Sequence, residues 1–307
     1  MPTAIPKIIP TITPTAIGVD LGGTAIKLGL VTATGEILKS MKIDTPQPSC
    51  PEQVLATIVD AIATLDPDRQ GAVIGLGVPG PTDKTGRIAQ VSINLEGWHQ
   101  VPVADVLEAQ TQRPTVAEND ANCAGLGEAW LGKGRDFQDW ILLTLGTGVG
   151  GAIFLNGQLF TGRTGAAGEL GLITLNPGGP ACNSGNQGSL EQHCSIRALR
   201  RDNGMGGRAL DQKAREGDPA AIAAWLRYGQ LLGAGIASHL YMLTPEAVIL
   251  GGGLSKVAEL FLPALNAEIE TRVMPTSREN LQILIAALGD QAGLIGAARL
   301  ALTHFYP

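Results

Sequence analysis

The segment Asp20–Thr24 (DLGGT) contains the residue types of a phosphate-binding turn. A carboxylate at the end of an apolar strand can reach Mg²⁺, directly or through water, while two following glycines let backbone N–H groups close on a phosphate. Lys27 follows on the expected return strand and adds a positive charge. The alternative for this segment alone is an ordinary tight hairpin.

A second glycine-rich segment, Gly146–Gly151 (GTGVGG), matches the G-x-G-x-x-G spacing of dinucleotide-binding proteins. That fingerprint must follow a strand and open a helix. Here the segment leads into Ala152–Leu155, which is another apolar strand. We therefore interpret it as a second phosphate loop, in which Thr147 offers a hydroxyl and an N–H group, and not as an NAD site.

Three consecutive glycines, Gly251–Gly253, follow a buried strand and precede a helix. Because glycine has no Cβ, an adenine or ribose could lie directly against the backbone there. Close packing between the helix and the strand is the alternative explanation.

The residues Glu118-Asn119-Asp120 join a short strand to the helix expected over 121–131. Asp120 could act as a general base there, because rigid backbone would hold its carboxylate within reach of a substrate hydroxyl. The alternative is that Asp120 only caps the helix, a role that suits aspartate. Glu169 and Glu191 are further carboxylates near glycines, and both could be plain surface acids.

An internal repeat in the sequence indicates how these segments are positioned. Residues 17–38 and 141–160 each contain two apolar strands around a Gly/Thr loop, then a turn and a third short strand. Asn156-Gly157, between such runs, is a strong hairpin signal. Two similar hairpins in one chain predict two lobes that are built alike.

The remaining pattern predicts strands that alternate with helices, an α/β fold whose sheets are covered on both faces. We expect a flexible tail over 1–15, a small lobe over 16–118 and a larger lobe over 119–307, whose last helix (about 291–303) packs back on the first lobe. The expected helices are 51–65, 103–110, 121–131, much of 190–243 and 291–300, and the expected buried strands are 72–78, 114–117 and 247–250.

Composition excludes several classes of function. The net charge is −6 and no run of Lys or Arg stands out, which argues against nucleic-acid binding through a basic face. No stretch approaches the roughly 18 apolar residues of a membrane-spanning helix. The first fifteen residues lack the apolar region of a signal peptide, and the four cysteines therefore indicate reduced thiols in the cytoplasm.

Several dispersed motifs together resemble the ROK family of repressors, open-reading-frame proteins and sugar kinases. The resemblance covers essentially residues 16–303. Its motifs occur in the family's order: DLGGTAIK at 20–27, VPGPTD at 78–83, ENDANCAGLG at 118–127, LGTGVGGAI at 145–153, AGELG at 167–171, LGGG at 250–253 and GDQAGLIGAA at 289–298. The resemblance implies a two-lobed actin-like, ribonuclease-H-like α/β fold, which fits the internal repeat.

The resemblance also implies a role for each matching residue. Asp120 would be the general base, and Asn119 would bind the sugar. The other implied roles are sugar binding for Asn94, Glu169 and Glu191, Mg²⁺ positioning for Asp20, phosphate binding for Gly22, Gly23, Thr24, Lys27, Thr147 and Gly148, and adenosine binding for Gly251, Gly252 and Gly253.

One segment departs from the family pattern. Zinc-bearing members read G-E-x-G-H and then C-x-C-G-x-x-G-C-L-E, whereas this chain has Leu172 in place of the histidine and Ser184 and Ser189 in place of two cysteines. Only Cys182 remains of four ligands, so we expect no structural zinc of the usual tetrahedral kind. A rearranged site with His193 and Cys194 is the alternative. In the family the same histidine also contacts the sugar, so the resemblance implies that Leu172 removes a hydrogen bond from the sugar pocket.

The resemblance implies an ATP- and Mg²⁺-dependent kinase of glucokinase type that phosphorylates the 6-hydroxyl of glucose in the cytoplasm, as a homodimer or dimer of dimers. Another hexose or an N-acylated aminosugar such as N-acetylmannosamine is the alternative substrate, and polyphosphate in place of ATP stays open. A non-catalytic sugar sensor or repressor is the alternative class. ROK repressors carry an N-terminal helix-turn-helix, whereas here the first hairpin begins near residue 16.

Overall fold

The computed structural model describes residues 14–92 and 94–307. Of the predicted tail, residues 1–13 lie outside this part of the chain. The first strand begins at Thr15, so it includes the last residue that the sequence placed in the tail.

The first sheet has the strand order β3-β2-β1-β4-β7. Its strands are β1 (Thr15–Leu21), β2 (Ala25–Thr32), β3 (Ile37–Asp44), β4 (Gly71–Val78) and β7 (Thr115–Asn119). The first three form an antiparallel meander, and β4 and β7 continue the sheet in parallel to β1. Helices α1 (Pro51–Leu65) and α2 (Val103–Thr111) pack on one face of this sheet through a shared apolar core.

The second sheet repeats this arrangement with the order β10-β9-β8-β11-β12. Its strands are β8 (Trp140–Leu145), β9 (Val149–Leu155), β10 (Gln158–Leu159), β11 (Ala247–Gly251) and β12 (Gln282–Ile285). Again three strands form an antiparallel meander, and two more run parallel to the first of them. The predicted duplication is therefore confirmed.

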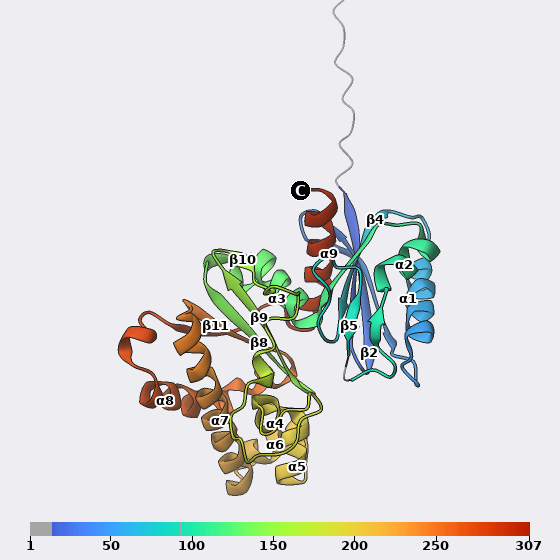
Figure 1. Ribbon diagram of the computed structural model, residues 1–307. Helices are drawn as coiled ribbons and strands as arrows, with labels where there is room; N and C mark the ends of the chain where they lie inside the picture. Colours follow the sequence, from blue (N-terminus) through green and yellow to red (C-terminus); the bar gives the residue numbers. More distant parts are fainter. Residues whose placement is uncertain (1–13, 93) are drawn as a thin grey trace, which may run out of the picture.

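Two helices, α3 (Asp120–Leu131) and α9 (Ala292–Phe305), lie side by side between the two lobes (Figure 1). α9 covers the second face of the first sheet, and α3 packs on the second sheet against the stacked rings of Trp140 and Phe154. The two helices approach so closely that a Cβ on Gly296 would lie 1.6 Å from the Cys123 carbonyl oxygen. Any side chain at this position would separate the helices that join the lobes.

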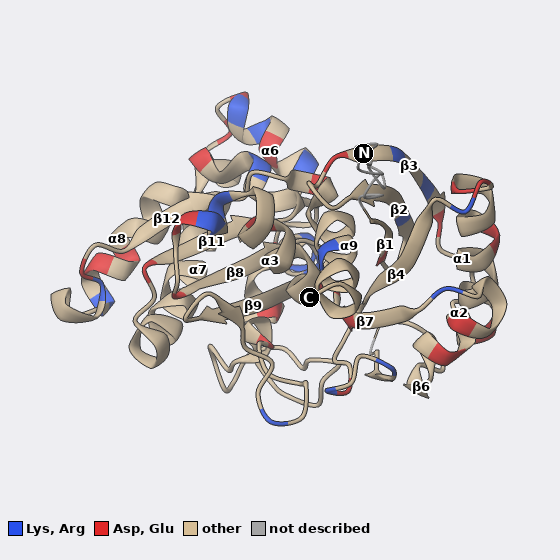
Figure 2. Cartoon of the chain, turned by 90° about the horizontal axis from the view of Figure 1, so that it is seen from above, with Lys and Arg blue, Asp and Glu red and all other residues tan. Residues whose placement is uncertain are grey.

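The other face of the second sheet carries an aromatic core of Trp225, Tyr228 and Phe261. On α6 and α8 basic and acidic residues are interspersed (Figure 2). No helix in the described ranges is both long and apolar enough to cross a membrane.

The remaining elements are β5 (Ala89–Val91), β6 (His99–Val101), η1 (Lys133–Asp136), η2 (Leu170–Leu172), α4 (Leu190–Cys194), α5 (Ile196–Asn203), α6 (Gly207–Arg215), α7 (Pro219–Leu243), η3 (Gly253–Leu260), α8 (Leu262–Arg272), η4 (Pro275–Ser277) and η5 (Gly289–Gln291).

Candidate active site

A hollow of about 250 Å³ lies where the ends of β1 and β11 approach the start of α3. Asp20 and Lys27 line it from the first lobe, and Asp120 lines it from the interlobe helix α3. The second lobe contributes the predicted glycines Gly251, Gly252 and Gly253. The structure therefore brings together three predicted groups that lie far apart in the sequence.

The junction between β7 and α3 orients Asp120. The side-chain oxygen of Asn119 accepts hydrogen bonds from the N–H groups of Ala121 and Asn122, at 2.9 and 3.0 Å, so Asn119 is the N-cap of α3. The alternative that Asp120 caps the helix is therefore wrong. Asp120 is the first helical residue, and its carboxylate accepts only the adjacent N–H of Ala121 among the described side-chain bonds.

Asp120 has the electrostatics of a base that works near neutral pH. Burial in the hollow raises the pKa of its carboxyl group from 3.8 to about 7, and the nearby carboxylates of Asp20 and Glu169 add to the shift. A general base is most effective when its pKa lies near the working pH.

Glu118 holds this junction in place, although the sequence analysis gave it no role. One of its carboxylate oxygens accepts hydrogen bonds from the N–H of Asn119, from the amide of Asn122 and from the hydroxyl of Thr82. The amide group of Asn119 in turn donates to the carbonyl oxygen of Gly80. These bonds connect the start of α3 to the loop after β4.

The turn between β1 and β2 presents the first candidate phosphate loop. The N–H of Gly22 donates to the carbonyl oxygen of Ala25, which closes the turn, and the Thr45 hydroxyl donates to the Gly22 carbonyl at 2.6 Å. Gly23 and Thr24 are exposed at the tip. These hydrogen bonds therefore hold the base of the loop, while its tip is exposed and can contact a ligand.

Asp20 lies at the base of this loop, with its carboxylate 3.2 Å from the ammonium of Lys27. Burial raises the pKa of Asp20 even though Lys27 opposes the shift. In residues 14–92 and 94–307 no group of three or more His, Cys, Asp or Glu side chains could hold a metal ion. One carboxylate still fits Mg²⁺, because this ion keeps several waters and is bound by one or two carboxylates together with substrate phosphates.

The second candidate phosphate loop is the turn between β8 and β9. Gly146 donates its N–H to the Gly148 carbonyl, and its own carbonyl accepts the N–H of Ile196 at the start of α5. Thr147 is exposed at the tip. The segment continues into β9 and not into a helix, so the sequence interpretation against a dinucleotide fingerprint is confirmed.

Glu191 on α4 lies against this second loop. Its carboxylate accepts the N–H of Val149 at 3.0 Å, and a Cβ on Gly148 would lie 2.2 Å from the same oxygen. Burial raises the pKa of Glu169, with Glu191 as the second cause, so the two carboxylates face the same region. Both side chains are half-buried, which disfavours the alternative that they are plain surface acids.

Asn94 has a partner that the sequence did not reveal. Its side-chain oxygen accepts from both terminal nitrogens of Arg197, at 3.4 Å each. Asn94 belongs to the first lobe and Arg197 to α5 of the second, so this contact crosses between the lobes.

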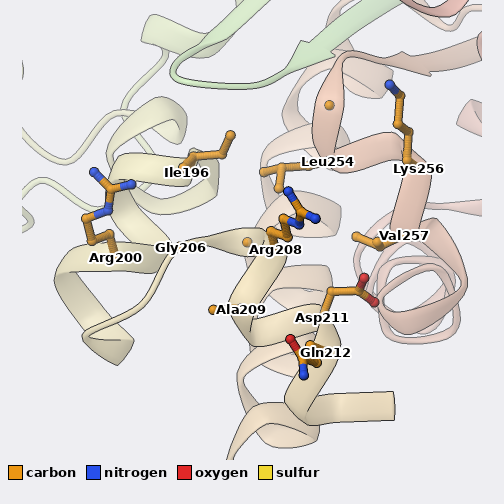
Figure 3. A pocket seen from close by; sticks show the side chains of 12 residues that line it. Ile196, Arg200, Gly206, Arg208, Ala209, Asp211, Gln212, Leu254, Lys256 and Val257 are labelled. Atoms are coloured by element: carbon orange, nitrogen blue, oxygen red, sulfur yellow. The ribbon is translucent and has the colours of Figure 1, made fainter.

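Gly251–Gly253 lead from the interlobe hollow into a larger cavity of about 710 Å³ (Figure 3). α5, α6 and η3 form its walls, which include the apolar side chains of Ile196, Leu254 and Val257. Gly252 has φ +81°, and a Cβ there would lie 2.5 Å from the Leu145 carbonyl oxygen. Gly252 therefore serves close packing against β8, whereas a Cβ on Gly253 would meet nothing within 4 Å and Gly253 borders the open cavity.

Comparison with known proteins decides the family. The family model described as ROK family matches residues 16–304. The chain belongs to the ROK family. It is 35% identical to the glucokinase of Thermotoga maritima, over 92% of this chain and 96% of that protein.

Solved ROK structures have the same fold. A glucokinase from Streptomyces griseus in complex with glucose and AMPPNP matches with a TM-score of 0.85 and 34% identity, over 94% of this chain and 99% of that one. A Listeria monocytogenes protein, described as a candidate N-acetylmannosamine kinase, matches with a TM-score of 0.80 and 29% identity, over 93% and 97%. The predicted family and the two-lobed actin-like α/β fold are therefore confirmed.

The segment in place of the ROK zinc motif is held by hydrogen bonds. The side-chain N–H of Asn186 donates to the Leu172 carbonyl at 2.7 Å, and its oxygen accepts from the Thr174 hydroxyl at 3.1 Å. The Ser184 hydroxyl donates to the Cys182 sulfur at 3.2 Å. Asn186, near the C-terminal end of the loop over 172–189, is therefore connected to residues at the N-terminal end of that loop.

These residues do not fit the zinc ion of the family. Leu172 has no donor atom, and the serine hydroxyls at 184 and 189 are poor replacements for thiolates. Cys194, a member of the alternative zinc site, is fully buried in the apolar core of the second lobe.

Proposed function

We propose that this ROK protein is an ATP-dependent hexose kinase that transfers the γ-phosphoryl group of ATP to the 6-hydroxyl of glucose. The observation that carries the proposal is the placement of Asp120, whose carboxyl group has a pKa of about 7 and lines the hollow between the lobes. The similarity to two glucokinases over nearly the whole chain supports the same reaction.

In the proposed reaction, Asp120 accepts the proton of the sugar hydroxyl as that oxygen attacks the γ-phosphorus. Asn119 and Glu169 are proposed to hold other sugar hydroxyls, together with Asn94 and Glu191. Because Asn119 also caps α3, one side chain would bind sugar and position the base. Catalysis then depends on positioning and on neutralising charge.

Mg-ATP is proposed to lie between the two hairpin loops. The backbone of Gly22–Thr24 and Lys27 would contact phosphate from the first lobe, and Thr147 and Gly148 would contact it from the second. Asp20 would hold Mg²⁺ through water, and the ion when bound neutralises the negative charge of the phosphates. Adenosine would lie in the cavity beside Gly251–Gly253.

A kinase for another hexose, or for an N-acetylhexosamine such as N-acetylmannosamine, is the second candidate function. Leu172 is the residue that favours it, because a leucine in the sugar pocket offers no hydrogen bond to a hydroxyl. Sites that recognise hydroxyls through hydrogen bonds discriminate strongly between sugars.

We further propose a homodimer in the cytoplasm, where the four free cysteines would stay reduced.

The test is an ADP-release assay with Mg-ATP against glucose, mannose, fructose, allose, N-acetylglucosamine and N-acetylmannosamine. The proposal predicts the highest kcat/KM for glucose. A preference for another sugar would move the substrate to the second candidate. Absence of turnover with all six, from folded protein that binds ATP, would contradict the kinase and favour a sugar sensor.

A further inference from the structure

Two hollows meet at one glycine of the second lobe. Gly253 lines the interlobe hollow that contains Asp120, and it also lines the larger cavity beside α6. If the protein is the proposed kinase, on which this inference rests, the nucleoside lies in the larger cavity and the γ-phosphoryl group lies near Asp120. The phosphate chain must then pass Gly253.

Lys256 lies at this junction. It is on η3, three residues after Gly253, and it lines the larger cavity. Its ammonium is 3.2 Å from a carboxylate oxygen of Asp290, a residue that lines the interlobe hollow. Figure 3 shows the Lys256 side chain extending away from Arg208 and Gln212. The ammonium is therefore held where one hollow opens into the other.

Lys256 can readily leave its ion pair with Asp290 for another anion. Both side chains are largely exposed, at 61% and 69%. Exposed ion pairs contribute little to stability, because water screens both charges. A phosphate chain carries more charge than a carboxylate and offers several acceptor oxygens to the three donors of an ammonium.

We propose that Lys256 binds the phosphate chain of the nucleotide, and that Asp290 is the partner it leaves when the nucleotide arrives. Asp290 keeps the ammonium at the junction while the site is free of nucleotide. Asp20 and Lys27 face the same hollow, and they neutralise one another at 3.2 Å. Lys256 is then the cation that the second lobe adds to the path of the phosphates.

The other cations of the larger cavity have a different place. Arg200 and Arg208 line it together with Gly206 and Gln212, beside α5 and α6 (Figure 3). These residues surround the space assigned to the nucleoside. A phosphate-binding role for Lys256 therefore predicts a dependence on the number of phosphates, whereas a nucleoside-binding role does not.

Isothermal titration calorimetry with adenosine, ADP and AMPPNP, each with Mg²⁺, tests the proposal. Lys256→Met is expected to weaken ADP and AMPPNP about tenfold, the effect of losing one charge-assisted hydrogen bond, and to leave adenosine unchanged. Lys256→Arg should retain most of the affinity for both nucleotides. Lys39→Met, which removes an exposed lysine of β3 that pairs with Leu30, is the matched control and should bind all three as the wild type does.

Asp290→Asn isolates the exchange of partners. It is expected to tighten ADP binding in the wild-type background and to have no effect together with Lys256→Met. An equal gain in both backgrounds would mean that Asp290 repels phosphate directly, which would overturn the exchange.

Two other results would overturn the phosphate contact itself. Equal losses for adenosine and ADP in Lys256→Met would assign the lysine to the nucleoside, and unchanged ADP binding would exclude the contact while leaving the proposed kinase intact. A wild-type protein that binds sugar but none of the nucleotides would instead contradict the kinase.

Discussion

The Glu191 carboxylate lies so close to Gly148 that a Cβ on this glycine would be 2.2 Å from its oxygen. The carboxylate also accepts the N–H of Val149, the next residue of the same loop. A residue proposed to bind sugar is therefore fixed to a loop proposed to bind phosphate. This contact couples the positions of the two substrates.

Gly148→Ala should disturb both substrates at once. The new methyl group must displace Glu191, so we expect a higher KM for the sugar and a kcat lower by about tenfold or more, because small displacements in an active site are costly. Gly146→Ala is the matched control, since a Cβ at Gly146 meets nothing within 4 Å. Steady-state kinetics that show the same values for both variants would contradict this coupling.

The pH dependence of activity should follow Asp120. A base works only when deprotonated, and burial raises the pKa of this carboxyl group to about 7. Activity is therefore present above this pH and is lost as the pH falls through it. We expect kcat/KM to drop about tenfold per pH unit below the pKa, since kcat/KM reports the free enzyme. A profile that stays flat down to pH 5 would contradict this assignment.

The same carboxylate should reduce stability at high pH. The pKa is higher in the folded state than the ordinary value of 3.8, so the folded state binds more protons between these values and stability falls as the pH rises. Asp120→Asn should therefore raise Tm at pH 8, by roughly 2–4 °C for each kcal/mol gained, and should have little effect near pH 4. Differential scanning calorimetry at both pH values measures this.

Asp60→Asn is the control for that comparison, because Asp60 is exposed on α1. Its Tm should shift equally little at both pH values. A pH-independent gain in Asp120→Asn would show that packing, and not charge, causes the change.

We expect Asn186 to hold the loop over 172–189 in place of a zinc ion. This loop lies in the chain between Glu169 and Glu191, the two glutamates proposed to bind sugar. Asn186→Ala removes the bonds to Leu172 and Thr174, so it should raise the KM for the sugar several-fold and leave the KM for ATP unchanged. Asn183→Ala, an exposed position of the same loop, should change neither. Loss of wild-type activity on incubation with a zinc chelator, restored by zinc, would refute the metal-free loop.

The sequence predicted those elements whose signals are local. Helix α1 has the predicted bounds because its apolar residues recur at helical spacing, and both hairpins follow from apolar runs around glycine turns. Strand β12 was missed because Gln282–Ile285 is short and its partner is the distant β11. The third strand is longer than predicted: it runs over Ile37–Asp44, with polar residues on its exposed face.

For the candidate site, the sequence predicted which residues take part but not the contacts between them. Asp120 and the glycines belong to motifs, but the contact between Arg197 and Asn94 joins residues that no local pattern connects. The same holds for Lys256 and Asp290, and for the bonds from Glu118 to Thr82. Such contacts depend on how segments that are distant in the sequence fold against each other, which spacing along the chain does not reveal.

The turnover of Asp120→Asn with Mg-ATP and glucose tests the central claim most directly. The amide keeps the shape of the side chain but accepts no proton, so kcat should fall by about 10²- to 10⁴-fold, while glucose and AMPPNP still bind by calorimetry. Asp60→Asn should turn over as the wild type does. A kcat for Asp120→Asn within about tenfold of the wild-type value would contradict the assignment of Asp120 as the general base.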